Sequence, residues 1–204
     1  MSGVRTSGID VSHYQGTVNW NKVKAAGHFF AFAKASESNG GRDSAFAKNL
    51  AGARSAGIRI GAYHFFRPSV SGTDQARNFL GAYTPSKGDL LPVCDLEDYD
   101  GSDIATYLKE LNAWLDAVSA KSNGSKAMIY TSATFWKKLG NPKVLGDHPL
   151  WVAHYGVSSP VLPAPWANWT IWQYGASGAV AGVNGPCDQD WFAGTPDDLS
   201  SITM

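Results

Sequence analysis

The chain has 204 residues, of which 44% are hydrophobic, 12% aromatic and 17% charged, with 17 acidic side chains against 17 basic ones. This length gives one domain with a sizeable core, and the low share of charged residues excludes a disordered chain or a coiled coil. Phosphate binding needs a basic face, so the balanced charge argues against a nucleic-acid partner. No run of about 18 apolar residues predicts a membrane span. We expect a monomer.

Short apolar segments recur at near-regular spacing and are expected to be strands. They lie at residues 8–11, 29–35, 58–65, 90–97, 127–131, 150–155, 170–174 and 183–190. Helical patterns separate the early ones: a short one from Trp20 to Gly27, one from Phe46 to Gly57, and an amphipathic one over 104–118 with Ser102 as its expected N-cap. Strands that alternate with helices predict a parallel sheet, and eight of them suggest a closed barrel.

The last third of the chain departs from this alternation. Pro160, Pro163 and Pro165 exclude a helix of normal length after the sixth strand. A glycine-rich link, with Gly175 and Gly178, suits a hairpin between the last two strands. We therefore expect these strands to join without helices and at least one to run antiparallel, giving an irregular β/α barrel in a single domain.

The segment Leu90-Leu91-Pro92-Val93-Cys94-Asp95-Leu96-Glu97 ends an apolar run in two acids. In a strand, residues two apart face the same side, so Asp95 and Glu97 project together. Burial and like charge both oppose ionisation, which favours one protonated and one charged carboxyl, the division of labour in glycoside hydrolysis. The alternative is a pair of loop acids satisfied by a nearby Arg or Lys.

Other polar and aromatic residues recur at expected strand ends, where barrels of this kind carry their chemistry. They are Asp10, Lys34, Glu37, Tyr63, His64, Tyr130, Trp151 and Asp188. Four carboxylates, Asp10, Asp95, Glu97 and Asp188, would share one rim with aromatic side chains. A sugar site needs this mixture, because acids act on the glycosidic bond and aromatic faces stack on sugar rings.

Each of these residues also has a structural interpretation. Asp10 could cap the next turn, His64 could be a core histidine bonded to a backbone carbonyl, and Tyr63, Tyr130 and Trp151 could fill the barrel. Glu37 and Asp43 are expected to order their loop and cap a helix near Ser44. Asp190 competes with Asp188, because the two share one face. Cys94 and Cys187 are expected to be buried and reduced rather than joined in a disulfide.

Six ordered segments resemble glycoside hydrolase family 25, the Chalaropsis-type lysozymes. They are Gly8-Ile9-Asp10-Val11-Ser12, Gly61-Ala62-Tyr63-His64-Phe65, Asp95-Leu96-Glu97, Leu150-Trp151-Val152-Ala153-His154-Tyr155, Trp172-Gln173-Tyr174 and Cys187-Asp188-Gln189-Asp190-Trp191-Phe192. The resemblance runs from about residue 8 to 194. It implies a (β/α)5β3 TIM-like barrel that cleaves the β-1,4 bond between N-acetylmuramic acid and N-acetylglucosamine in bacterial peptidoglycan.

The resemblance also implies roles for individual residues. Glu97 matches the proton donor and Asp95 the residue that stabilises the reacting N-acetyl group, while Asp10 and Asp188 match two further rim acids. Lys34, Tyr63, Tyr130 and Trp151 match sugar-contacting positions. We expect substrate-assisted catalysis in which Asp95 stays ionised, with no cofactor and no metal.

Residues 1–204 are expected to form one catalytic domain that reaches the wall through its groove, without a separate wall-binding module. Residues 1–8 lack the apolar stretch of a signal peptide, so action outside the cell implies a removed leader or phage-type release. Two other functions stay open. One is a glycan-binding barrel without catalysis, and the other is a metal-dependent hydrolase built on the rim acids with His13 and His64.

Overall fold

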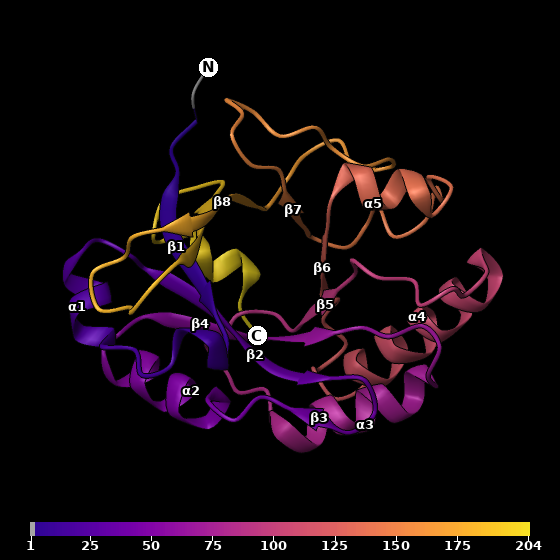
Figure 1. Ribbon diagram of the computed structural model, residues 1–204, viewed down its shortest axis with the longest axis horizontal. Coiled ribbons are helices and arrows are strands. Elements are labelled where there is room, and N and C mark those ends of the chain that lie inside the picture. Colours follow the sequence, from indigo (N-terminus) through magenta and orange to yellow (C-terminus); the bar gives the residue numbers. More distant parts are fainter. Residues whose placement is uncertain (1–2) are drawn as a thin grey trace.

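The computed structural model describes residues 3–204 and shows a closed barrel (Figure 1). Strand order in the sheet is β1-β9-β8-β7-β6-β5-β4-β2-β3, and pairing of β1 with β2 closes the ring. The eight barrel strands are β1 (Thr6–Val11), β2 (Phe30–Glu37), β4 (Arg59–Phe65), β5 (Val93–Asp95), β6 (Met128–Thr131), β7 (Leu150–Ala153), β8 (Ile171–Gly178) and β9 (Cys187–Phe192). The two-residue β3 (Gly41–Arg42) is an antiparallel addition to the end of β2.

Five α-helices follow the first five barrel strands: α1 (Trp20–Ala25), α2 (Phe46–Ser55), α3 (Gly72–Ala82), α4 (Ile104–Ser119) and α5 (Ala133–Lys138). The (β/α)5β3 prediction is therefore confirmed. Two 3-10 turns, η1 (His13–Gln15) and η2 (Asp198–Ile202), complete the elements. Among residues 3–204, none of these helices combines the length and the apolar character needed to cross a bilayer.

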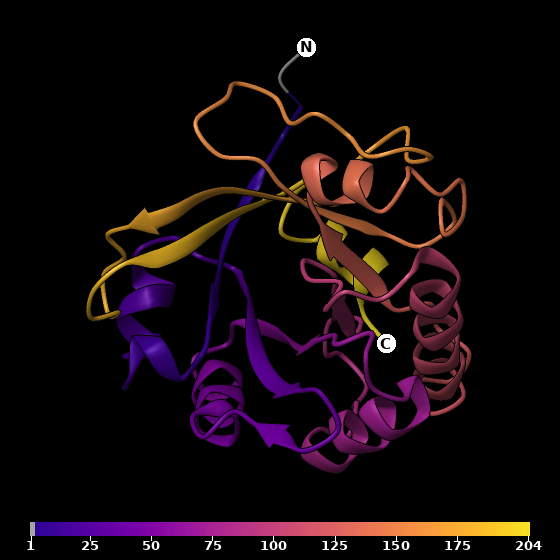
Figure 2. The same ribbon diagram turned by 45° about the vertical axis from the view of Figure 1, so that its right-hand side comes forward.

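The final three strands join without helices, as the prolines and glycines predict. β7 and β8 are parallel, whereas β9 is antiparallel to both β8 and β1. The β8–β9 hairpin, orange and yellow in Figure 2, reaches past the barrel to the indigo α1 region. There the Asn19 backbone N–H donates to the Gly182 carbonyl at 2.7 Å, so the hairpin tip packs on the start of α1.

Alternation along the strands divides the core into two layers. Inside the barrel lie large side chains, including Phe30, Phe32, Val93, Met128, Trp151, Ile171 and Phe192. Outside it, small and branched residues pack against the helices. A Cβ on Gly8 would lie 2.4 Å from the Phe30 ring and one on Gly61 2.5 Å from the Phe32 ring, so these inward glycines make room for the two phenylalanines.

The C-terminal turn closes one end of the barrel interior. Leu199 and Ile202 of η2 join the inner cluster, and the Leu91 backbone N–H donates to the Ile202 carbonyl at 2.9 Å. Figure 1 shows this yellow segment within the ring of strands. The opposite end, where the parallel strands finish, stays available for the site.

Several local predictions need correction. β5 ends at Asp95, so Glu97 lies two residues beyond the strand. The N-cap of α4 is Asp103 and not Ser102, because the Asp103 carboxylate accepts a hydrogen bond from the Thr106 N–H. Helices α3 and α5 were not predicted. The buried face of α3 includes polar Gln75 and Asn78, which weakens the apolar stripe. Cys94 and Cys187 are buried and free, as expected.

Candidate active site

A cavity of about 280 Å³ opens at the carboxyl ends of the parallel strands. It is lined by Asp10, Tyr63, Asp95, Glu97, Tyr130, Trp151, Tyr155, Gln173, Ala176 and Asp188. Seven of the eight predicted site residues are in this lining, and the eighth, Lys34, lines the adjoining hollow. These seven residues lie on six strands or on the loops that follow them. Closure of the barrel brings together strand ends that are far apart in sequence.

Two further hollows flank the cavity, and Glu97 lines all three. One hollow extends over Tyr14, Lys34, Glu37 and Arg67. The other extends over Ser132, Ala153, His154 and Tyr155. The three form a groove that passes Glu97 and continues on both sides, a shape that accommodates a chain rather than a compact ligand.

Asp95 and Glu97 differ in burial. Asp95 is 5% exposed and its Oδ1 has no hydrogen-bond partner among the described residues. Burial and the charge of Glu97 raise the pKa of Asp95 well above its usual value. Partial loss of solvation raises the pKa of Glu97 as well, although Glu97 is exposed at the surface and the Lys34 ammonium opposes this rise. Asp95 is thus the more deeply buried of the two acids.

A second group of acids lies on β1 and β9, where Asp10 pairs in register with Asp188. Burial and the charges of Asp190 and Asp188 raise the pKa of Asp10 well above its usual value. Burial raises the pKa of Asp188 to about 6. Asp188 and Asp190 both face inward, but only Asp188 lines the cavity. Asp190 is fully buried below it, where its Oδ1 accepts a hydrogen bond from Trp151 Nε1 at 2.9 Å.

Gln173 is a central residue of the site that sequence reasoning did not single out. Its Oε1 accepts hydrogen bonds from the hydroxyls of Tyr130 at 2.7 Å and Tyr155 at 2.5 Å, and its Nε2 donates to Asp10 Oδ2 at 2.7 Å. A signal was present, because Gln173 has the same strand parity as inward Ile171 and is a polar residue between two aromatics.

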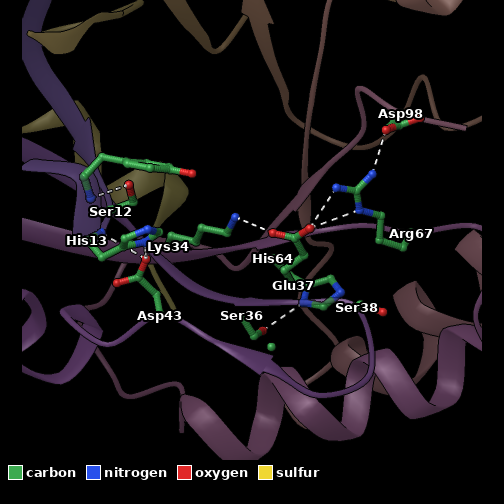
Figure 3. Close-up of polar contacts among 12 residues, drawn as sticks. Ser12, His13, Lys34, Ser36, Glu37, Ser38, Asp43, His64, Arg67 and Asp98 are labelled. Atoms are coloured by element: carbon green, nitrogen blue, oxygen red, sulfur yellow. Dashed lines mark hydrogen bonds and ion pairs between the residues drawn. The ribbon is translucent and has the colours of Figure 1, made fainter. Parts of the chain in front are cut away.

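Lys34 and Glu37 belong to a row of ion pairs beside the cavity (Figure 3). Lys34 Nζ donates to Glu37 Oε2 at 2.7 Å, and Arg67 contacts Glu37 Oε1 at 2.8 Å, Asp98 Oδ2 at 2.6 Å and Asp100 Oδ1 at 3.0 Å. Glu37 therefore pairs with cations. The prediction that Glu37 caps the helix near Ser44 is wrong, because no side chain caps α2. Arg67 ties β2 and the segment after β4 to the loop that follows Glu97.

His64 is a core residue, as its structural interpretation predicts, but its partners are side chains rather than a backbone carbonyl. Nδ1 lies 2.8 Å from Ser36 Oγ and Nε2 lies 3.1 Å from Gln75 Oε1, while the ring stacks on Trp114. Burial lowers the pKa of His64 to about 4. This ring packs outside the barrel, away from the rim acids. Within residues 3–204, no three His, Cys, Asp or Glu side chains are grouped to hold a metal ion.

Comparison with known proteins identifies the fold and the family. Residues 9–183 match the family model described as glycosyl hydrolases family 25. The chain belongs to this family. It is 38% identical to lysozyme M1 of Streptomyces globisporus over 212 residues, covering 98% of this chain and 71% of that protein. It is 32% identical to the N,O-diacetylmuramidase of a Chalaropsis species, covering 96% and 97% of the two chains.

Solved structures agree with this assignment. The bacterial lysozyme of Streptomyces coelicolor superposes with a TM-score of 0.92 at 36% identity, covering 100% of this chain and 98% of that one. A family 25 lysozyme from Aspergillus fumigatus gives a TM-score of 0.89 at 30% identity, covering 98% and 99%. The protein is therefore a family 25 glycoside hydrolase of the lysozyme type.

Proposed function

We propose that this family 25 enzyme is a muramidase that hydrolyses the β-1,4 bond between N-acetylmuramic acid and N-acetylglucosamine in peptidoglycan. The names of its lysozyme and muramidase relatives support this substrate. The observation that carries the proposal is the position of Glu97, on a groove that continues to both sides and beside three further acids. An enzyme that cuts inside a glycan strand needs room for sugars on each side of the scissile bond.

Glu97 acts as the general acid in this proposal. A raised pKa keeps the carboxyl protonated at a pH where an isolated glutamate would be ionised. Its partial exposure lets it reach the glycosidic oxygen, to which it donates its proton as the C1–O bond breaks. Water later attacks C1, and the Glu97 carboxylate takes the proton back.

Asp95 acts on the N-acetyl group of the sugar that is cleaved. The acetamido oxygen attacks C1 as the leaving oxygen departs, which closes a five-membered ring and makes the N–H strongly acidic. Asp95 as carboxylate accepts a hydrogen bond from that N–H and opposes the positive charge. Burial raises the pKa of Asp95 and so makes its carboxylate a better hydrogen-bond acceptor.

The other predicted residues shape the cavity. The charge of Asp188 raises the pKa of Glu97, Asp10 lines the same cavity, and Tyr63, Tyr130 and Trp151 offer aromatic surface to the sugar ring. Lys34 balances part of the negative charge from the adjoining hollow. We propose that residues 1–204 work as one catalytic unit, as a monomer acting on the wall outside the cell, without a cofactor.

The test is clearing of a purified peptidoglycan suspension, with reducing ends identified by mass spectrometry. Glu97→Gln should lower the rate by about 10²–10⁴-fold with an unchanged melting temperature. Asp116→Asn, on the exposed face of α4, makes the same acid-to-amide change away from the groove and should behave as wild type. Muramic acid at the new reducing ends identifies a muramidase, and glucosamine there contradicts the proposed bond. Binding of wall fragments without new reducing ends would leave a glycan-binding barrel, and loss of activity with a chelator would favour a metal-dependent hydrolase.

A further inference from the structure

Tyr14 is the most exposed large hydrophobic side chain among the described residues, at 81% exposure. It lines the hollow that continues from Glu97 over Lys34, Glu37 and Arg67, but it does not line the central cavity. An exposed tyrosine contributes little to folding, because it removes little apolar surface from water. Its place on the groove calls for another explanation.

The turn that carries Tyr14 is fixed at both ends. The Gln15 side chain accepts from the Ser12 N–H at 2.9 Å, and Ser12 Oγ accepts from the Tyr14 N–H at 3.3 Å, so η1 has a capping box. Gln15 Nε2 also donates to the Pro186 carbonyl at 3.2 Å, which ties η1 to the residue before β9. These contacts hold the backbone of Tyr14 without covering its ring.

The ring itself is supported on one side only. The His13 ring lies 4.1 Å from the Tyr14 ring, centroid to centroid, at an interplanar angle of 35°. His13 is in turn held by Asp43, whose Oδ2 accepts from the His13 backbone N–H at 3.0 Å and contacts Nδ1 at 2.7 Å. Figure 3 shows His13 directed at Asp43. A supported ring with a free face is pre-organised for stacking, because little side-chain entropy remains to be lost on binding.

We propose that Tyr14 is the aromatic platform of a sugar subsite next to the reacting centre, and that it stacks on an N-acetylhexosamine ring of the same glycan strand. The inference rests on the proposed function, which places a glycan across Glu97. The surrounding groups suit a sugar, since Gln15, Lys34, Glu37 and Arg67 in the same hollow offer donors and acceptors to hydroxyl and acetamido groups.

Rates on glycan strands of increasing length test this subsite. Strands freed of stem peptides and fractionated from two to eight sugars provide the series. Wild-type kcat/KM should rise at the length at which the strand first reaches Tyr14. Tyr14→Ala should match wild type below that length and lose about 3- to 10-fold above it, while Tyr14→Trp retains the gain. Phe29→Ala, which removes an exposed aromatic side chain just before β2 and outside the groove, is the matched control.

The outcomes separate the two proposals. A wild type that releases no muramic acid ends contradicts the proposed function itself. A wild type that cleaves, with Tyr14→Ala following its curve at every length, overturns the platform alone. An equal loss at every length, or a shifted melting temperature, would make Tyr14 a structural residue and also overturn it. A wild-type rate that does not depend on length contradicts the subsite as well.

Discussion

Gln173 Nε2 donates to Asp10 Oδ2 at 2.7 Å, joining β8 to β1 between residues 163 positions apart in the chain. The same amide accepts from the hydroxyls of Tyr130 and Tyr155, so one buried side chain orients an acid and two phenols of the cavity wall. The hydrogen bond from Gln173 also lowers the pKa of Asp10, against the larger effect of burial. Gln173 is thus a positioning residue for this wall.

Gln173→Leu should lower kcat/KM by about 10- to 100-fold, because it removes the donor to Asp10 and the acceptor shared by both tyrosines, leaving buried polar groups unpaired. Tyr155→Phe removes one of these hydrogen bonds and leaves Asp10 held, so its loss should be below about fivefold. Steady-state rates on peptidoglycan, with melting temperatures, check both. Equal activity of Gln173→Leu and wild type would show that the network does not position the site.

Two substitutions should move the alkaline limb of the pH profile in opposite directions. Activity requires protonated Glu97, so it falls as pH rises through the raised pKa of that group. Lys34 lowers the pKa of Glu97 and Asp188 raises it. Lys34→Met should therefore shift the limb to higher pH, and Asp188→Asn to lower pH. The measurement is kcat/KM from pH 3 to 9, where the sign of the shift is informative even if the rate falls. Shifts in the same direction would contradict the assignment of Glu97 as the acid.

Asp188 and Asp190 should respond differently to amide substitution. Asp188→Asn changes a cavity-lining group and should cost more than tenfold in kcat/KM, on the scale of about 10²-fold for a positioned acid. Asp190→Asn keeps the acceptor for Trp151 and removes a buried acid whose Oδ2 has no hydrogen-bond partner within residues 3–204. It should raise the free energy of unfolding at pH 7 by about 1–3 kcal/mol with little loss of rate. A greater loss of rate in Asp190→Asn than in Asp188→Asn would show that Asp190, and not Asp188, is the functional acid of the rim.

His64 should make the fold sensitive to acid. Its folded pKa is about 4, against 6.5 for the free side chain, because burial disfavours the charged ring. As the pH falls, the unfolded chain therefore binds a proton at His64 before the folded chain does. Stability from this group is fully present above pH 6.5 and falls between pH 6.5 and 4, by about 3 kcal/mol from the linkage relation.

Urea denaturation at several pH values tests this. His64→Gln should be less stable at neutral pH, since it loses packing on Trp114, but its stability should fall less between pH 6.5 and 4. Parallel curves for wild type and His64→Gln would show that another group causes the acid sensitivity.

Local sequence pattern was enough for much of the architecture. Proline positions after Tyr155 and glycines after Tyr174 predict helix-free connections, because both residue types limit the backbone directly. Apolar periodicity predicts α4, but it misses α3, whose inner face includes Gln75, bonded to His64 and to the backbone of Arg67. A polar residue that is buried because a partner is present has no periodic signal of its own.

What the sequence by itself determined is the set of acids at strand ends and the parity that points them inward, since side-chain direction in a strand follows from position alone. Only the tertiary structure decided how these acids differ. Strand pairing buries Asp190 under Trp151 and leaves Asp188 on the cavity, and it brings Gln173 to Asp10. Burial and partners set the charge state of each carboxyl, and both depend on distances between strands that closure of the barrel fixes.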